Sequence, residues 1–351
     1  MRRLIITLEW LALTVVSGGS GRTAAGEECP PAAGLNFVCG LVAAEDLVRV
    51  PGTHWIIGSG MAEKGKPGKL HLINAESRSW EVLYPGASSL NALDARSYAG
   101  CPGAPDAQTF GAHGIALRDD GDRAGTVLAV NHGREAIEVF RLDSSGVKPE
   151  IRWVGCVPMD SNTYVNSVAF LPGGGFVATR FFDPKAPGGF GSIMERKPTG
   201  GVLEWHPESG IWQIPGTELA GANGIVVSKD GKTIYVAAWG ASELVRFTRT
   251  NGSAQKTAVP VSFFPDNLRW APDGTILVAG QNAGAKTDGG FPGFKGWTVA
   301  KLDPATLKVT EVLKDRGESP MQNASVAIDV DGTLWIGTFG GDRVAYRSVK
   351  Q

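Results

Sequence analysis

The chain has 351 residues, and its hydrophobic fraction of 42 % is sufficient for a large buried core and too high for a disordered protein. Its 34 Lys and Arg residues balance 35 Asp and Glu residues, so the formal net charge is −1. This charge provides no electrostatic footprint for nucleic acid and no polybasic segment for an anionic membrane. We therefore expect a small molecule as the partner.

The first 30 residues have the pattern of a secretory leader. Arg2 and Arg3 precede an apolar run over 4–16, and small residues follow at 23–26. The run is shorter than the ~20 residues that span a bilayer. We therefore expect a signal peptide over 1–30, no transmembrane span, and a secreted or periplasmic protein, with an uncleaved leader that anchors the chain as the alternative.

The four cysteines, Cys29, Cys39, Cys101 and Cys156, form an even set that an exported protein can oxidise to two disulfides. Pairing 29 with 39 and 101 with 156 is one of three arrangements, and the sequence does not select among them. None lies in a Cys-x-x-Cys motif or has a histidine at zinc-ligand spacing. Disulfides or inert thiols are therefore expected in preference to a metal site or a nucleophile.

Six segments of the chain share one design, and self-similarity at a spacing of about 40 to 50 residues is typical of β-propellers. Each segment has a polar start, an apolar strand, a glycine-containing turn and a second strand rich in β-branched residues. A single blade cannot bury both of its faces, whereas six blades arranged radially bury them against one another. The sequence thus predicts an all-β, six-bladed β-propeller as a single domain over 35–351. The six segments begin at Ala44, Ala112, Val165, Ala222, Pro265 and Ala324.

Polar residues occupy the starts of these six segments. In a propeller the innermost strands start near the same end of the central channel, so these side chains are predicted to be neighbours. A set rich in oxygen and free of sulfur favours a hard cation, and Ca²⁺ over Mg²⁺ when several protein oxygens reach the ion. The alternative is that each Asn or Asp only caps the backbone at its strand start. The set comprises Glu45, Asp46, His113, Asn166, Asn223, Asp266, Asn267 and Ser325.

Two of the five histidines are candidates for catalysis. His113 belongs to the polar set, and His132 follows the second strand of the same segment. Antiparallel pairing can bring the His132 ring behind that of His113, and two imidazoles in contact can relay a proton. The remaining histidines lie outside the set and are expected to be structural.

These residues resemble the calcium-dependent propeller lactonases and esterases related to paraoxonase, within the wider gluconolactonase and regucalcin (SMP-30-like) superfamily. The resemblance is most specific in Ala-His-Gly-Ile at 112–115, followed by Leu-Ala-Val-Asn-His-Gly at 128–133 and Ile-Glu-Val-Phe at 137–140. It covers nearly the whole chain after about residue 35.

The resemblance implies roles for single residues. His113 and His132 would form the catalytic dyad, and Asp46 with the Ile115 carbonyl would belong to a second, structural calcium site. That second site uses an acidic residue directly after the first Asn, and this chain has Ser167 there, so one catalytic Ca²⁺ is expected and the presence of a second, structural ion is left open. The implied ligands of the catalytic calcium are Glu45, Asn166, Asn223, Asp266 and Asn267.

Ring closure is expected to differ from the paraoxonases, which join their first and last strands by a disulfide. This chain has no cysteine beyond 156. We therefore expect closure by pairing of a strand near 35–38 with one near 343–347.

The expected reaction is hydrolysis of a lactone or of an aryl or carboxylic ester, with Ca²⁺ polarising the carbonyl and the two histidines activating water. One alternative is a sugar lactonase that uses the metal and an Asp. Another is a non-catalytic propeller that binds a ligand and keeps calcium for stability. Substrate specificity is expected in loops at 88–109, 183–201 and 280–296.

Overall fold

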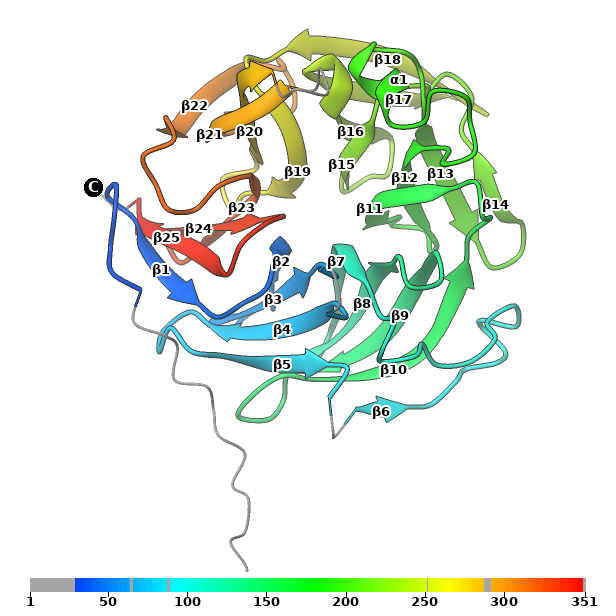
Figure 1. Cartoon of the computed structure of the whole chain (residues 1–351). Coiled ribbons are helices and arrows are strands. Elements are labelled where there is room, and N and C mark those ends of the chain that lie inside the picture. Colours follow the sequence, from blue (N-terminus) through cyan, green and yellow to red (C-terminus); the bar gives the residue numbers. More distant parts are fainter. Residues whose placement is uncertain (1–28, 64–65, 87–88, 251, 287–291, 350–351) are drawn as a thin grey trace, which may run out of the picture.

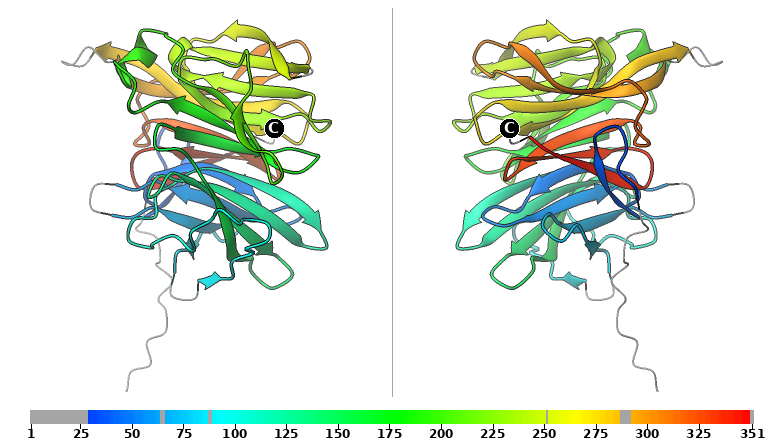
Figure 2. Two further views of the ribbon diagram at one scale, coloured as in Figure 1. Left: turned by 90° about the vertical axis from the view of Figure 1, so that its right-hand side faces the viewer. Right: turned by 90° about the vertical axis from the view of Figure 1, so that its left-hand side faces the viewer.

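Figure 1 shows a computed structural model of the chain, which describes residues 29–63, 66–86, 89–250, 252–286 and 292–349. The predicted leader lies outside these residues, apart from its last two positions. Six sheets surround a central channel, and their innermost strands contact one another in chain order. In the side views of Figure 2 the strands run between the two faces of the ring, where the connecting loops lie. The predicted all-β, six-bladed β-propeller is confirmed.

Five blades are formed by consecutive strands. The first contains β2 (Ala44–Arg49), β3 (Trp55–Gly60), β4 (Lys69–Asn74) and β5 (Trp80–Tyr84). The second contains β7 (Ala112–Gly121), β8 (Ala124–Asn131), β9 (Ala136–Asp143) and β10 (Glu150–Pro158), with the short β6 (Leu90–Asn91) parallel to β10. The third contains β11 (Tyr164–Phe170), β12 (Phe176–Phe182), β13 (Gly201–His206) and β14 (Gly210–Gln213). The fourth contains β15 (Ala222–Val227), β16 (Thr233–Ala238), β17 (Glu243–Thr250) and β18 (Ser253–Pro260), and the fifth contains β19 (Phe264–Trp270), β20 (Ile276–Lys286), β21 (Pro292–Leu302) and β22 (Val309–Asp315).

The sixth blade closes the ring with strands from both ends of the chain. It consists of β23 (Ala324–Val330), β24 (Thr333–Thr338), β25 (Arg343–Ser348) and β1 (Asn36–Cys39). β1 pairs antiparallel with β25, with Phe37 opposite Ala345. The predicted strand closure is therefore confirmed, and the disulfide between Cys29 and Cys39 holds the segment that precedes β1.

Among the residues that the structure describes, helical structure is confined to the four-residue α1 (Gly191–Met194) and the short 3₁₀ helix η1 (Trp239–Ala241). Within the described ranges, no helix is long and apolar enough to cross a membrane. The expected loop at 183–201 contains α1. The prediction of an irregular loop at 280–296 is wrong, because β20 and β21 continue through this region as a long hairpin. Its pairs include Gln281 with Trp297 and Ala283 with Phe294, so cross-strand hydrogen bonds maintain the strands although the glycine-rich sequence shows no alternation.

Two glycines bring neighbouring innermost strands unusually close at the polar starts. A Cβ atom at Gly114 would lie 2.4 Å from the Asn166 carbonyl oxygen, and one at Gly224 would lie 2.4 Å from the Asp266 carbonyl oxygen. Real Cβ atoms do not tolerate such contacts with backbone, so only glycine allows this approach. Each of these glycines directly follows a predicted site residue, which places His113 near Asn166 and Asn223 near Asp266.

Gly224→Ala is expected to lower the free energy of unfolding by about 1–3 kcal/mol, because the added methyl group would push two strands of the inner ring apart. Gly173→Ala is the matched control, since a Cβ there meets nothing within 4 Å. Urea unfolding of both variants checks the prediction. Equal stabilities for the two variants would show that the close approach of the strands is not a constraint.

Candidate metal and catalytic site

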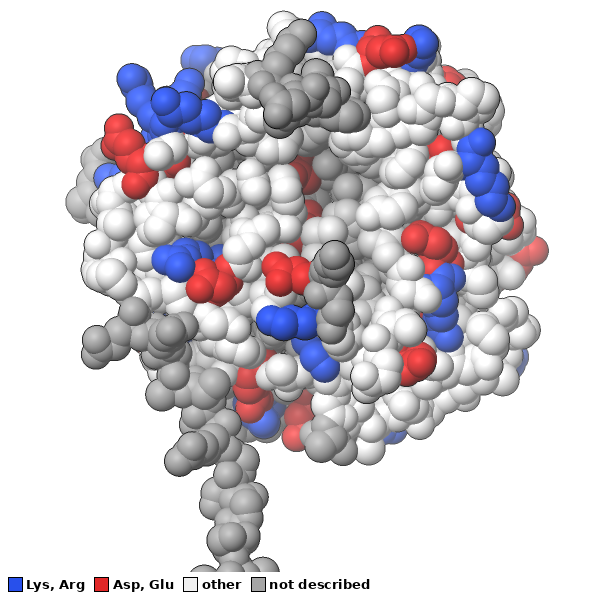
Figure 3. All heavy atoms as spheres, viewed as in Figure 1, with Lys and Arg blue, Asp and Glu red and all other residues white. Residues whose placement is uncertain are grey.

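Polar side chains from five blades face one cavity of about 480 Å³ at one end of the central channel. Figure 3 shows a depression at the centre of this face, with acidic atoms at its base. The innermost strands β2, β7, β11, β15 and β19 each contribute one of these side chains, as the sequence predicted from their positions. The polar lining residues are Glu45, His113, Asn166, Asn223 and Asp266.

A β-bulge or register irregularity occurs at the start of every innermost strand. In β19 the pairing with β20 shifts between Pro265 and Leu268, and the other five innermost strands have equivalent shifts. Strict alternation would direct Asp266 and Asn267 to opposite faces of the sheet. A bulge changes the direction of side chains locally, so both residues contribute to the same end of the channel.

Four buried oxygens of the predicted ligand set have no hydrogen-bond partner. They are Glu45 Oε2, Asn166 Oδ1, Asn223 Oδ1 and Asn267 Oδ1. A buried polar group left without a partner costs about 1–3 kcal/mol, and a bound ion is one of the ways in which native proteins satisfy such groups. Because these acceptors come from four separate strands of the inner ring, a shared cation would satisfy all of them together.

The remaining atoms of the site hold these oxygens in place. Asn267 Nδ2 donates to Glu45 Oε1 at 2.5 Å, which orients the Asn267 oxygen away from that bond. Gln281 Nε2 donates to Asp266 Oδ2 at 2.8 Å, and Gln281 Oε1 accepts from Trp239 Nε1 at 2.9 Å. The site is thus pre-organised by amide groups and not by a positively charged side chain.

The two carboxylates lie in an environment that favours a cation. Burial raises the pKa of Glu45 well above its usual value, and the Asp46 and Asp266 carboxylates add to the effect. Burial also raises the pKa of Asp266 to about 7. Across the described residues no group of three or more His, Cys, Asp or Glu side chains gathers to hold a metal. The other predicted ligands are amide oxygens. Two carboxylates and three amides fit the oxygen chemistry of Ca²⁺.

The two histidines form a hydrogen-bonded chain that ends at an acidic residue. His113 Nδ1 lies 2.7 Å from His132 Nε2, and His132 Nδ1 lies 2.8 Å from Glu135 Oε1. His113 Nε2 lies 3.7 Å from Glu45 Oε1, so the other edge of this ring faces the predicted ligands. Burial, together with the neighbouring His132, lowers the pKa of His113 well below its usual value. The sequence predicted this pair but not Glu135.

Tyr164 supports the second histidine from the cavity side. Its ring stacks on that of His132 with 4.1 Å between centroids and 14° between planes. Tyr164 also lines the cavity, and burial raises its pKa to about 12. It therefore remains a neutral phenol near neutral pH and shields one face of His132.

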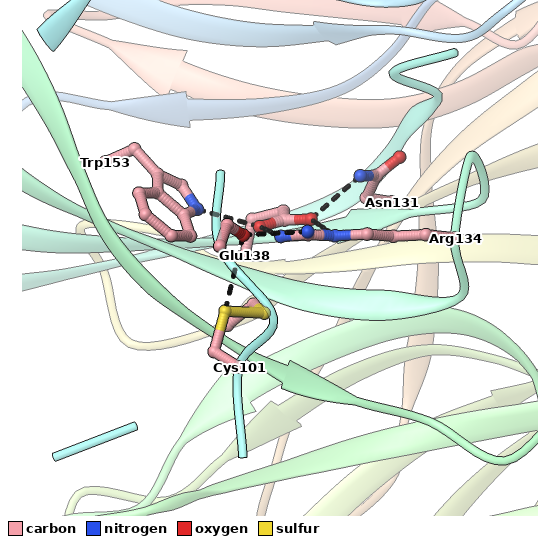
Figure 4. The surroundings of a disulfide bond; sticks show 7 residues. Cys101, Asn131, Arg134, Glu138 and Trp153 are labelled. Atoms are coloured by element: carbon pink, nitrogen blue, oxygen red, sulfur yellow. Dashed lines mark hydrogen bonds and ion pairs between the residues drawn. A yellow bond between two sulfur atoms is a disulfide. The ribbon is translucent and has the colours of Figure 1, made fainter. Parts of the chain in front are cut away.

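Asn131 joins the two segments that carry the histidines. Its Oδ1 accepts from the backbone N–H groups of Gly111 and Gly133, both at 2.9 Å, and its Nδ2 donates to Glu138 Oε1 at 2.8 Å. Glu138 is fully buried and also binds Arg134 through two hydrogen bonds of 2.7 and 2.6 Å and Trp153 Nε1 at 2.8 Å, next to the disulfide of Cys101 (Figure 4).

This network was not predicted from the sequence. A usable signal is the acidic residue inside the otherwise apolar run of 136–140, since a buried acid requires partners. Cys101 pairs with Cys156. Both disulfides thus follow the pairing that the sequence analysis named as one of three arrangements.

Glu138→Ala is expected to destabilise the protein by about 3 kcal/mol or more, because it leaves the Arg134 guanidinium without its buried partner. It also frees Asn131, so any activity that depends on the two histidines is expected to decline more than stability alone explains. Urea unfolding and steady-state kinetics at a temperature where the variant is folded measure the two effects. Glu150→Gln, at an exposed position of the same blade, is the control and should match the unsubstituted protein.

Above the polar floor the cavity is walled by aromatic and thioether side chains. They come from the residue after β3, from β12, from residues around α1 and η1, from β21 and from the segment after β24. Of the described residues, no lysine or arginine lines the cavity. Phe190, Met194 and Phe294 belong to two of the segments predicted to carry specificity, whereas 88–109 contributes no lining residue. The apolar lining comprises Met61, Phe181, Phe182, Phe190, Met194, Trp239, Phe294 and Phe339.

Three members of the polar set, Asp46, Asn267 and Ser325, are not among the residues that line the cavity. Asn267 adjoins the cavity through its hydrogen bond to Glu45. Ser325 Oγ donates to the Glu45 carbonyl oxygen at 2.6 Å. Asp46 is fully buried, and its carboxylate pairs with Arg269. The structure therefore separates Asp46 from the residues predicted to bind the catalytic ion.

A relative among known proteins agrees with the family resemblance that the sequence motifs indicated. No protein-family model matches the chain. The chain is 24 % identical over 313 residues to serum paraoxonase/lactonase 3 of Homo sapiens, a match that covers 84 % of this chain and 83 % of that protein.

Solved structures share the fold at low sequence identity. A putative gluconolactonase has a TM-score of 0.54 and 16 % identity, and covers 91 % of this chain and 95 % of its own. A calcium-binding regucalcin from Agrobacterium tumefaciens has a TM-score of 0.53 and 14 % identity, and covers 90 % and 93 %. The chain is thus similar in sequence to a paraoxonase-type lactonase and in fold to proteins described as gluconolactonase and regucalcin, as its motifs predicted.

Proposed function

We propose that this protein is a calcium-dependent hydrolase that opens lactones or cleaves aryl or carboxylic esters. The observation that carries the proposal is the cavity itself, in which buried oxygens without partners lie beside a hydrogen-bonded pair of histidines. The sequence similarity to a human lactonase supports the same reaction class.

Glu45, Asn166, Asn223, Asp266 and Asn267 would hold the ion. When bound, calcium would supply an electrophile for a substrate carbonyl oxygen and would stabilise the negative charge that develops there. The protein's own contribution is to fix these five side chains in position before the substrate arrives, which the hydrogen bonds to Glu45 and Asp266 support.

The histidine chain would act as the base. An ionised Glu135 carboxylate can only accept, so in this proposal His132 donates to it from Nδ1, His132 Nε2 accepts from His113 Nδ1–H, and His113 Nε2 keeps its lone pair toward the cavity. His113 would take a proton from the attacking water at Nε2 and pass its Nδ1 proton to His132. The lowered pKa of His113 supports this role because the ring is neutral before the reaction.

The cavity wall favours a hydrophobic substrate. Its volume of about 480 Å³ is in the range of small-molecule sites. An aromatic wall without charged groups offers few partners to a polyhydroxylated ring, whose hydroxyl groups would lose their hydrogen bonds to water. Lactones with an alkyl chain or an aryl group are therefore preferred over sugar lactones in this proposal.

The test is hydrolysis of a substrate panel with calcium and with a calcium chelator. The panel contains an alkyl-substituted γ-lactone, phenyl acetate and glucono-1,5-lactone. We expect turnover of the first two, loss of activity with chelator and recovery with excess Ca²⁺. Activity that is independent of calcium contradicts the proposal, and turnover of gluconolactone alone would favour the sugar lactonase.

We also propose that the protein works in an oxidising compartment, as a secreted or periplasmic protein. The two disulfides support this location, because such bonds persist outside the reducing cytosol. Cell fractionation followed by thiol labelling under denaturing conditions tests it. Recovery from the cytosolic fraction with four free thiols would contradict the assignment.

A further inference from the structure

Beneath the candidate metal site, a buried ion pair crosses the central channel. Asp46 directly follows Glu45 on β2, and its side chain is fully buried. Asp46 Oδ1 accepts from Leu47 N–H at 2.9 Å, and Oδ2 accepts from Ile115 N–H at 2.8 Å and from Arg269 Nη2. Asp46 therefore has a complete set of partners without a metal ion.

The Arg269 guanidinium is enclosed by oxygen atoms on all three of its nitrogens. Besides Asp46, Nη2 donates to the Ile115 carbonyl at 2.8 Å, Nε to the Leu47 carbonyl at 3.0 Å, and Nη1 to the Leu268 carbonyl at 2.8 Å. A carboxylate with several backbone carbonyls is the ligand set of a hard divalent cation. Here a positively charged side chain takes those oxygens.

Arg269 spans the ring from one side to the other. It begins on β19 in the fifth blade and reaches β2 in the first blade and β7 in the second, which lie across the channel from it in Figure 1. Toward the far end of the channel it is one of the residues that line a second cavity. A position at the centre of the ring lets one side chain hold three blades.

The charges of the side chains around Asp46 do not fit a second divalent ion. Ser167 lies beside Gly114, the residue before Ile115, and brings a hydroxyl group and no negative charge to this position. Its hydroxyl is buried without a partner. One carboxylate, Asp46, is therefore matched by one guanidinium, and the residues do not fit a structural calcium.

We infer that Arg269 permanently occupies the position of a second cation in the channel, so that this protein binds a single calcium ion, at Glu45, and uses a side chain to hold its inner ring. The single ion rests on the proposed function, whereas the assignment of Arg269 rests on its own contacts. Removing calcium should therefore inactivate the protein and leave the propeller folded.

The test counts ions. Protein freed of metal with a chelator is dialysed to equilibrium against CaCl₂, and calcium per chain is measured by mass spectrometry in the unsubstituted protein and two variants. We expect one ion in the unsubstituted protein, none in Glu45→Gln and one in Asp46→Asn. Two ions in the unsubstituted protein, or loss of the ion in Asp46→Asn with retention in Glu45→Gln, would overturn the inference.

A variant designed to gain a cation site tests the assignment of Arg269 separately from the claim that the protein binds calcium at Glu45. Arg269→Ser combined with Ser167→Asp removes the guanidinium and adds a second carboxylate beside Ile115, so it should bind one ion more than the unsubstituted protein and melt at a calcium-dependent temperature. If the unsubstituted protein binds no ion, the proposed calcium-dependent function fails, while a gain of one ion in the double variant still supports Arg269 as the internal cation. A folded double variant that gains no ion contradicts it.

Discussion

Glu45→Gln is expected to abolish measurable calcium binding and to reduce hydrolysis by about 10²-fold or more, since the variant loses one of the two carboxylates that face the cavity. Glutamine has nearly the same shape and can still accept from Asn267, so the propeller should remain folded. Calorimetric titration with CaCl₂ and turnover of the alkyl lactone measure the two effects. Glu208→Gln, on an exposed turn of the third blade, is the control.

Calcium affinity should also increase with pH. In the protein without metal, burial raises the pKa of Asp266 to about 7 and the pKa of Glu45 well above its usual value. Because the ion binds the deprotonated forms, its uptake releases protons and its affinity increases as pH rises through 7. Calorimetric titrations at pH 6 and 8 in buffers of different ionisation enthalpy give the calcium affinity and the number of protons released. An affinity that does not change with pH would place the ion elsewhere.

Much of the site followed from the sequence because of one geometric property of the propeller. The innermost strands start at the same end of the channel, so residues at equivalent positions of the repeat meet. Asn166, Asn223 and Asp266 were therefore predicted as neighbours although they lie far apart in the chain. The ring closure was predictable for the same reason, since a sixth blade without its outermost strand requires β1.

Arg269 was missed because local pattern gives the wrong direction for its side chain. It follows the buried Leu268 on β19, and simple alternation would place an arginine there at the solvent. The bulge between Pro265 and Leu268 changes the local geometry, and its partners at Asp46 and Ile115 belong to distant blades. Long-range charge pairing of this kind leaves no signal within a window of ten residues.

The aromatic wall was missed for a different reason. Its members come from strand ends, a short helix and a long hairpin, each fixed by tertiary contacts and not by the repeat. Trp239 and Phe264 pack at 4.9 Å between ring centroids, and Phe294 contacts both. Sequence indicated that the region around 183–201 and 280–296 would face the substrate, but only the fold shows that this face is apolar.

His113→Gln is expected to reduce kcat by about 10²-fold or more, because it removes the general base while the cavity keeps its shape. Calcium affinity and KM should change little, since His113 is not among the proposed ligands and glutamine fills a similar volume. Steady-state kinetics on the alkyl lactone and calorimetric titration with CaCl₂ separate the two. Full activity in this variant would contradict the dyad and favour chemistry by the metal and Asp266.

Glu135→Gln tests how the proton is held in the same chain. A glutamine can still contact His132 but no longer supplies the negative charge that favours the proton on His132 Nδ1 and stabilises the ring once it has accepted a second one. We expect a lower kcat with KM unchanged, an effect smaller than that of His113→Gln, and a shift in the ¹⁵N resonances that report the His132 tautomer. Glu135→Asp should retain more activity than Glu135→Gln, because aspartate keeps the negative charge. If Glu135→Gln and Glu135→Asp are equally active and the resonances do not move, the carboxylate has no part in the relay, and the base must be His113 and His132 alone.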